Sequence, residues 1–226
     1  MKKSKRNCII LGGGGHARVL IDALQFDENV VILGILDPDP ELKGKEILGI
    51  PVLGNDNLLP HLLKKGLTHF LVGVGTVGDD SLRYRLYLYG LTSGLEPQSV
   101  KHPSAVISKW AKLGRGYQIM AQCIVNAGVT IGENVILNSG AIVEHDCTLG
   151  NHIHIATGAH LASTVKVDDH VHIGVGASIR QCISIGKGAV VGGGAMVVND
   201  VSPRTIVVGN PARPLIKGNL KKKLNY

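Results

Sequence analysis

The chain has 226 residues, of which 18% are charged and 4% are aromatic, and its formal net charge is +7. Eight positive charges without nearby acidic residues account for this balance, and they lie near the two ends: Lys2, Lys3, Lys5, Arg6, Lys217, Lys221, Lys222 and Lys223. Because the rest of the chain is almost neutral, the composition excludes an extended basic surface for nucleic acid. No apolar stretch approaches the length of a membrane span.

Residues 1–100 have the pattern of a small α/β domain. The sequence NCIILGGGGHARVLIDALQ joins a short apolar run, four glycines and a helical pattern. Two further apolar runs, VVILGILDPD and HFLVGVGTV, end in polar or glycine-rich turns. This order predicts a half-Rossmann-like sheet of three or four parallel strands, whose ligand binds at the carboxyl ends of the strands.

The glycine cluster at 12–15 indicates the kind of ligand. Glycines let the backbone approach a phosphate or a sugar, and the free N–H groups of the following helix favour an anion. A G-x-G-x-x-A pattern is frequent by chance, so this signal is weak by itself. A domain of this length is also short for a dinucleotide, so a mononucleotide or a nucleotide-linked sugar fits better than NAD.

The expected location is the cytoplasm. The basic sequence KKSKRNCIIL imitates a signal peptide, but its apolar run ends after four residues at the glycine cluster. Cys8, Cys123, Cys147 and Cys182 form no C-x-x-C pair. We therefore expect them to be small buried hydrophobic residues in a reducing compartment.

Residues 101–226 contain a repeat of six residues. Steps of six from Ile107 to Val197 meet Ile, Leu or Val at all sixteen positions, and the residue four places later is apolar each time. A period of six fits no α-helix and is typical of a left-handed parallel β-helix. Each hexad then forms one short strand with its aliphatic side chain inward, and three hexads close a triangular coil. About five coils are expected, stacked roughly 4.8 Å apart.

Three ionisable residues, Glu144, His145 and Asp146, stand together inside this repeat. His145 occupies the third position of its hexad, where a side chain can leave the coil. A histidine is a suitable base at neutral pH, and an adjacent carboxylate can fix its tautomer. On spacing alone, a solvated polar patch is the commoner explanation of such a cluster. Glu144 could face either a substrate or solvent.

The two halves together resemble the bacterial nucleotide-sugar acetyltransferases among the hexapeptide-repeat acyltransferases. This family includes the bacillosamine-pathway N-acetyltransferase and the sialic acid O-acetyltransferases. The similar segments are IILGGGGHA, ILDPD, VGVGT, LNSGAIVEHDCTLGNHIHIATGA and VVNDVSPRTIVVGNPAR, which span nearly the whole chain. The resemblance implies a homotrimer with acetyl-CoA in the groove between neighbouring subunits, and a nucleotide-linked sugar held by the N-terminal domain.

The resemblance also implies a role for individual residues. The implied base is His145, and the acid that follows it is Asp146. The implied acetyl-CoA contacts are His154, Ser163, Val175 and Gly193. The implied nucleotide-sugar contacts are Gly14, Gly15, His16, Asp37 and Gly75.

Ser163 stacks one coil above His145, so its backbone N–H could polarise the thioester carbonyl, although the family usually has glycine there. Pro38 replaces a second acid of the family, which leaves the nucleotide base open.

The expected reaction is acetyl transfer from acetyl-CoA to the 4-amino group of a nucleotide-linked deoxysugar, with UDP as the first choice of nucleotide. A neutral amine is already nucleophilic, whereas a hydroxyl needs stronger activation. One moderate base therefore favours N-acetylation. The alternative is O-acetylation of a sialic acid or a related sugar, which the same His145 could perform.

Six histidines between 145 and 172 raise a different possibility, a zinc enzyme. Zinc carbonic anhydrases built on this coil use two histidines five residues apart, and no pair in the sequence has that spacing. The pairs His152/His170 and His154/His172 stack in two columns, and we expect them to be structural ladders, with no metal required. A scaffold without chemistry would leave the glycine-rich first domain unexplained.

Overall fold

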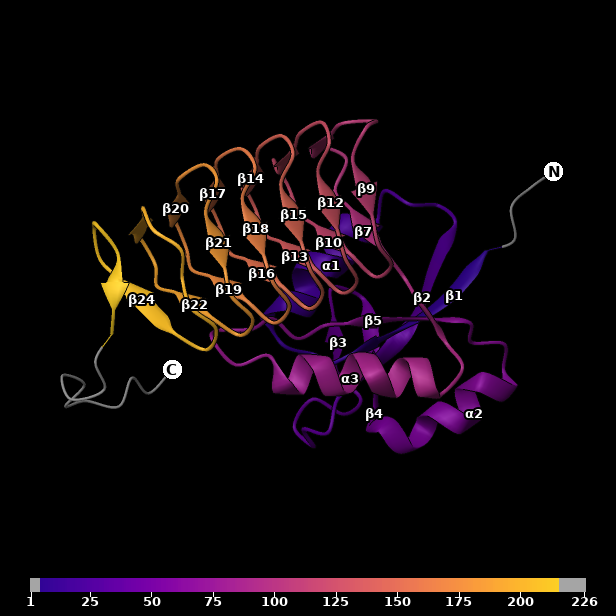
Figure 1. Ribbon diagram of the computed structural model, residues 1–226. Coiled ribbons are helices and arrows are strands. Elements are labelled where there is room, and N and C mark those ends of the chain that lie inside the picture. Colours follow the sequence, from indigo (N-terminus) through magenta and orange to yellow (C-terminus); the bar gives the residue numbers. More distant parts are fainter. Residues whose placement is uncertain (1–4, 216–226) are drawn as a thin grey trace.

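The structure is a computed structural model that describes residues 5–215. An α/β domain leads into a long coil of short strands, and the domain lies alongside one side of the coil (Figure 1). Of the basic residues near the two ends, Lys2, Lys3, Lys217, Lys221, Lys222 and Lys223 lie outside the described residues. Within residues 5–215, no helix has the length and apolar character needed to cross a membrane.

The first domain contains a six-stranded sheet in the order β3-β4-β2-β1-β5-β6. Its strands are β1 (Arg6–Leu11), β2 (Val30–Leu36), β3 (Glu46–Ile47), β4 (Ile50–Gly54), β5 (His69–Val72) and β6 (Glu96–Pro97). All neighbours are parallel except β3 and β4. The expected three or four strands were too few, because the edge strands β3 and β6 are two residues long and too short to show a strand pattern.

Helices cover both faces of this sheet. Along β1, Cys8 and Ile10 pack in one core with α1 (Gly15–Leu24), whereas Ile9 and Leu11 pack in a second core on the opposite face. The second core includes residues of η1 (Asp56–Leu58), α2 (Leu59–Lys64) and α3 (Ser81–Thr92). This alternation follows from the two-residue period of a strand. The α1 core continues into the interior of the coil.

The coil has three parallel faces, as the period of six predicts, and each strand pairs with the strand 18 residues further on. The covered face, on which the α/β domain packs, contains β7 (Val100–Lys101), β10 (Gln118–Ile119), β13 (Ile136–Leu137), β16 (His154–Ile155), β19 (His172–Ile173), β22 (Val190–Val191), β24 (Ile206–Val208) and the antiparallel β25 (Arg213–Pro214). The apolar face contains β8 (Val106–Ile107), β11 (Ile124–Val125), β14 (Ile142–Val143), β17 (His160–Leu161), β20 (Ser178–Ile179) and β23 (Met196–Val197). The polar face contains β9 (Lys112–Leu113), β12 (Thr130–Ile131), β15 (Thr148–Leu149), β18 (Lys166–Val167) and β21 (Ser184–Ile185).

The aliphatic residue of most hexads is buried inside the coil, so the predicted inward column is confirmed. Cys8, Cys123 and Cys147 are also buried, as expected. The expectation for Cys182 was wrong, because this residue is exposed. It occupies a corner with φ of 60°, where the backbone turns and the side chain leaves the core.

Candidate active site

His145 lies at a corner of the coil, between the apolar face and the polar face, and we call this the His145 corner. It follows β14, and its side chain is 57% exposed. The imidazole Nδ1 is 2.8 Å from Oδ2 of Asp146. Because an ionised carboxylate only accepts hydrogen bonds, Nδ1 carries the hydrogen and Nε2 is left to accept a proton. This arrangement suits a general base oriented by an acid.

The position of Asp146 depends on the coil below it. Asp146 has φ of 61°, and Gly128 stands in the same column one coil earlier. A Cβ atom on Gly128 would overlap Oδ1 of Asp146, so only glycine leaves room for the carboxylate. The position of Glu144 also depends on the coil below it, because Nδ2 of Asn126 donates a hydrogen bond to Oε2 of Glu144 at 2.8 Å. Neither Asn126 nor Gly128 was predicted, although the spacing of 18 residues links both to the cluster.

Ser163 stands next to His145 in the following coil. The strands β14 and β17 pair in register, and Thr164 N donates to His145 O at 3.0 Å. Within residues 5–215, no hydrogen-bond acceptor is found for the Ser163 N–H. The backbone donor that the resemblance implies is therefore free at the His145 corner.

Val175 and Gly193 lie at a different corner, between the covered face and the apolar face, which we call the Val175 corner. Val175 is exposed, and a Cβ atom on Gly193 would lie 3.3 Å from Val175 O. The two residues therefore stack on successive coils, and because Gly193 has no side chain, the backbone at this corner is uncovered. The structure separates them from His145 within one chain, but both corners border the apolar face.

His154 lies on the covered face, beneath the α/β domain, and is only 8% exposed. Its Nδ1 is 2.8 Å from the carbonyl oxygen of Thr76, so Nδ1 carries the hydrogen and Nε2 is the acceptor, 3.4 Å from Nδ2 of Asn138. Burial, together with the nearby His172, lowers the pKa of His154 to about 3. The imidazole is therefore neutral at physiological pH.

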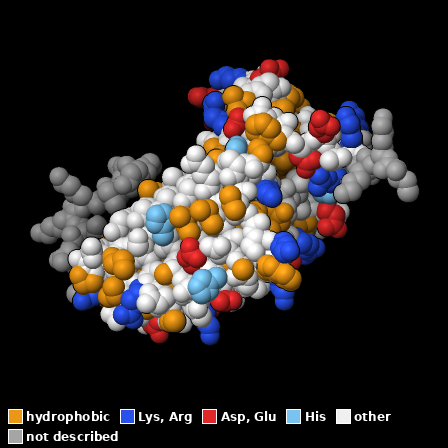
Figure 2. Space-filling model, turned by 90° about the horizontal axis from the view of Figure 1, so that it is seen from above, with side chains coloured by type: hydrophobic (Ala, Val, Ile, Leu, Met, Phe, Trp, Pro, Cys, Tyr) orange, Lys and Arg blue, Asp and Glu red, His pale blue; other side chains and the backbone are white. Residues whose placement is uncertain are grey.

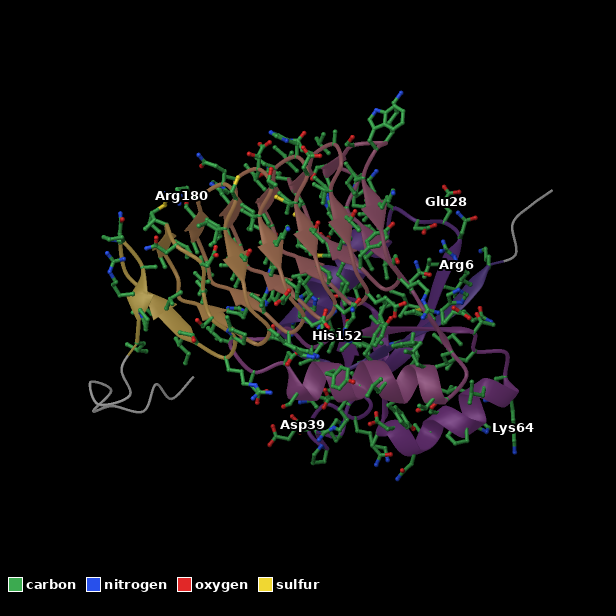
Figure 3. The ribbon with its side chains drawn as sticks, in the orientation of Figure 1. Arg6, Glu28, Asp39, Lys64, His152 and Arg180 are labelled. Atoms are coloured by element: carbon green, nitrogen blue, oxygen red, sulfur yellow. The ribbon has the colours of Figure 1, made fainter. Side chains whose placement is uncertain are left out.

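The two histidine ladders are present as predicted. The rings of His152 and His170 are stacked with centroids 5.0 Å apart, and those of His154 and His172 are also 5.0 Å apart, edge to face. His152 lies between the coil and α3 (Figure 3), and His170 Nδ1 is 2.7 Å from Asp80 Oδ2. These ladders fasten the α/β domain to the coil. No group of three His, Cys, Asp or Glu in residues 5–215 is arranged to hold a metal ion.

The glycine-rich turn lies at the carboxyl end of β1, beside the coil. Gly14 and Gly15 are exposed, and a Cβ atom on either would meet nothing within 4 Å. His16 Nε2 is 2.7 Å from Oε1 of Gln118 on β10. A Cβ atom on Gly75, which follows β5, would lie 3.8 Å from His16 Cβ. The four predicted residues Gly14, Gly15, His16 and Gly75 are thus brought together next to the covered face.

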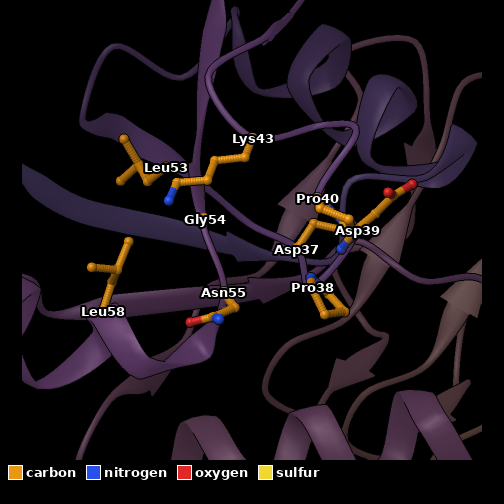
Figure 4. A pocket seen from close by; sticks show the side chains of 9 residues that line it. All are labelled: Asp37, Pro38, Asp39, Pro40, Lys43, Leu53, Gly54, Asn55 and Leu58. Atoms are coloured by element: carbon orange, nitrogen blue, oxygen red, sulfur yellow. The ribbon is translucent and has the colours of Figure 1, made fainter.

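Asp37 directly follows β2, as expected, and each oxygen of its carboxylate accepts one hydrogen bond from the backbone. Oδ2 accepts from Gly13 N at 2.6 Å, and Oδ1 accepts from Asp39 N at 2.9 Å. Asp37 therefore fixes the glycine-rich turn. It also lines a cavity of about 340 Å³ at the ends of β2 and β4, together with Lys43 and Asn55 (Figure 4). Lys43 and Asn55 were not predicted, because they belong to no motif and converge only through the fold.

Comparisons with known proteins agree with this geometry. The model of the PglD N-terminal domain matches residues 7–88, and the model of the bacterial transferase hexapeptide (six repeats) matches residues 111–145. PerB from Caulobacter crescentus, solved with CoA and GDP-perosamine, is 37% identical with a TM-score of 0.86, over 93% of this chain and 97% of that chain. The acetyltransferase domain of PglB from Neisseria gonorrhoeae, solved with acetyl coenzyme A, is 33% identical with a TM-score of 0.82, over 94% of this chain and all of that one. WeeI from Acinetobacter baumannii is 26% identical with a TM-score of 0.73, over 93% of this chain and all of that one. A search of curated proteins returned no significant match.

A glycine-rich α/β domain followed by a hexapeptide coil with an exposed His–Asp pair defines an acyltransferase of the hexapeptide class. Within that class, the chain belongs to the nucleotide-sugar N-acetyltransferases. It is an acetyltransferase that uses acetyl-CoA. The predicted family, fold class and type of reaction are confirmed.

Proposed function

We propose that the protein transfers the acetyl group of acetyl-CoA to the 4-amino group of a nucleotide-linked deoxysugar, with His145 as the general base. The observation that carries this proposal is the exposed His145 with Nε2 free and Nδ1 held by Asp146 at 2.8 Å. The amine nitrogen attacks the thioester carbonyl while Nε2 takes the proton of the amine. Asp146 stabilises the imidazolium, and the Ser163 N–H donates to the carbonyl oxygen. The C–S bond then breaks, and the thiolate of CoA takes the proton from His145.

On the acceptor side, Gly14 and Gly15 hold the diphosphate, because they leave open backbone at the N-terminus of α1. The nucleoside occupies the cavity at Asp37, where Lys43 and Asn55 supply a cation and an amide. UDP is the nucleotide expected from the resemblance, whereas PerB from Caulobacter crescentus was solved with GDP-perosamine. UDP- and GDP-linked 4-amino sugars are therefore the first two acceptors to compare.

We further propose that the active form is a homotrimer. In a triangular coil each corner lies opposite one face, and the His145 corner is opposite the covered face, on which the α/β domain of the same chain packs. A sugar held by that domain cannot reach the His145 of its own chain. A neighbouring subunit must therefore supply the base.

The exposed side chains of the coil support this assembly. Outward positions on the apolar face are Val106, Ile124, Ile142, His160, Ser178 and Met196. Those on the polar face are Lys112, Thr130, Thr148, Lys166 and Ser184. The view from above shows hydrophobic side chains exposed on the surface of the coil, with a few histidines and acidic residues among them (Figure 2). Contact between subunits across the apolar face would bring the His145 corner of one next to the Val175 corner of the next, with acetyl-CoA between them.

Thiol release from acetyl-CoA tests the proposal on a panel of UDP-, GDP-, dTDP- and CMP-linked sugars that carry either a 4-amino group or only hydroxyls. We expect turnover with one 4-amino sugar, and a loss of roughly 10²–10⁴ in kcat for His145→Ala. His61→Ala, an exposed histidine on α2, is the control and should behave like the wild type. Wild-type turnover in His145→Ala would remove this base, and turnover confined to hydroxyl acceptors would overturn N-acetylation.

A further inference from the structure

Two exposed residues, Lys109 and Trp110, form the start of the His145 corner. The in-register pairing of β8, β11 and β14 sets Lys109 two coils below His145 and Trp110 two coils below Asp146. Trp110 is 69% exposed, and the Nζ of Lys109 lies 5.2 Å from the centroid of its ring. Trp110 is also the single tryptophan of the chain. A large indole and an ammonium group therefore stand together at the corner that carries the base.

Directly between these residues and the His145–Asp146 pair, the corner carries two small residues, which follow Asn126 in the chain. One coil separates the two levels, and its corner residues are Ala127 and Gly128, both exposed. At roughly 4.8 Å per coil, the indole and ammonium lie about 10 Å from the imidazole along the coil axis. The corner thus presents a base at one end, a shallow section in the middle, and an aromatic ring with a cation at the other end.

The level of Trp110 matches that of the acceptor domain. His16 of the glycine-rich turn binds Gln118 of β10, and Gln118 is eight residues after Trp110, less than half of an 18-residue coil. A threefold axis along the coil rotates subunits without shifting them, so equal levels face one another. In the trimer, Trp110 of one subunit is therefore level with the glycine-rich turn of its neighbour.

We propose that Lys109 and Trp110 of one subunit complete the nucleotide-sugar site of the neighbouring subunit. Lys109 pairs with the diphosphate, and the ring of Trp110 packs on the nucleoside beyond it. This inference rests on the proposed function, which brings His145 to the acceptor amine held by the neighbour. The chemistry agrees with the position, because a diphosphate needs a cation and a base or ribose needs a flat apolar surface. The site would then select acceptors by their nucleotide as well as by their sugar.

Fluorescence provides the first test, because Trp110 is the only tryptophan of the chain and is therefore the source of all its tryptophan emission. We expect UDP or GDP to change the tryptophan emission of the trimer in a saturable way, without acetyl-CoA present. The titration needs no turnover, so it decides this proposal even if no panel sugar is acetylated. If both nucleotides bind, as measured by calorimetry, and the emission does not change, the proposal is wrong.

Steady-state kinetics provides the second test. Trp110→Ala should raise the KM for the nucleotide sugar about tenfold, which corresponds to about 1.4 kcal/mol and lies within the range for loss of one stacked ring, and it should leave the KM for acetyl-CoA unchanged. Trp110→Phe should recover most of that loss. Lys109→Met should raise the same KM and weaken its dependence on salt, whereas Lys112→Met, an exposed lysine on the polar face, should not.

Sedimentation of the same variants distinguishes a substrate contact from an assembly contact. We expect Trp110→Ala to remain a trimer with an unchanged melting temperature, since the indole is exposed within the subunit. A monomeric Trp110→Ala would show that the indole holds subunits together, and an unchanged KM in a trimeric variant would show that it contacts neither partner. Either result overturns the proposal. Failure of His145→Ala to lose activity would instead contradict the proposed base.

Discussion

The glycine beneath Asp146 offers a test of how the coil positions the proposed catalytic pair, His145 and Asp146. We predict that Gly128→Ala lowers turnover although His145 and Asp146 themselves are unchanged. Gly128 has φ of +77°, and the added Cβ atom would overlap Oδ1 of Asp146. The carboxylate must move, and Nδ1 of His145 then loses its partner at 2.8 Å. The expected fall in kcat is on the order of 10-fold to 100-fold, below the loss expected when the base itself is removed.

The same substitution also strains the backbone, and this second effect has to be separated from the first. A residue with a Cβ atom at positive φ costs about 1–2 kcal/mol relative to glycine. Gly188 is a matched control at another corner, because its φ is +67° and a Cβ atom there would meet only Arg204 at 3.6 Å, an ordinary contact. Gly188→Ala should therefore lose similar stability and keep its activity.

Thiol release with saturating acetyl-CoA gives kcat for both variants, and thermal unfolding gives their stability. The expected pattern is a similar fall in melting temperature for both variants and a fall in kcat for Gly128→Ala alone. If both variants keep the wild-type kcat, the position of the Asp146 carboxylate does not matter for turnover. If both lose kcat equally, backbone strain in the coil is responsible, and the steric argument at Asp146 is refuted.

Three further outcomes are expected. Ile142→Lys on the apolar face should give an inactive monomer in sedimentation, whereas Thr130→Lys on the polar face should stay trimeric and active. The free energy of unfolding should fall as the pH drops below 6.5, by at most about 1.4 kcal/mol per pH unit for each of His16 and His154. Burial lowers the pKa of these histidines in the folded protein to about 4 and about 3, whereas in the unfolded chain they already bind protons near pH 6.5. Calorimetry from pH 7.5 to pH 5 measures this loss. Arg83→Met should lower the free energy of unfolding by about 3 kcal/mol in denaturant titration, because Arg83 is 2% exposed and its guanidinium donates to two backbone carbonyls and an amide oxygen.

Features that repeat along the chain could be predicted from the sequence, because the repeat itself sets the geometry. A period of six fixes which side chains enter the coil, and three hexads per turn stack residues 18 apart. The stacking of His152 on His170 and the exposure of His145 beside Asp146 follow from that arithmetic. The glycine-rich turn was also predictable, because a strand, glycines and a helix in sequence leave few alternatives.

What the sequence by itself determined is thus the coil, the family and the identity of the His–Asp pair. Only the tertiary structure decided how the α/β domain packs on one face of the coil. That packing buries His154 against Thr76, while the fold of the α/β domain itself turns the carboxylate of Asp37 toward Gly13 and gathers Lys43 and Asn55 at a cavity. These contacts join residues with no shared period or motif. Their geometry depends on how segments far apart in the chain fit together, which no local pattern in the sequence encodes.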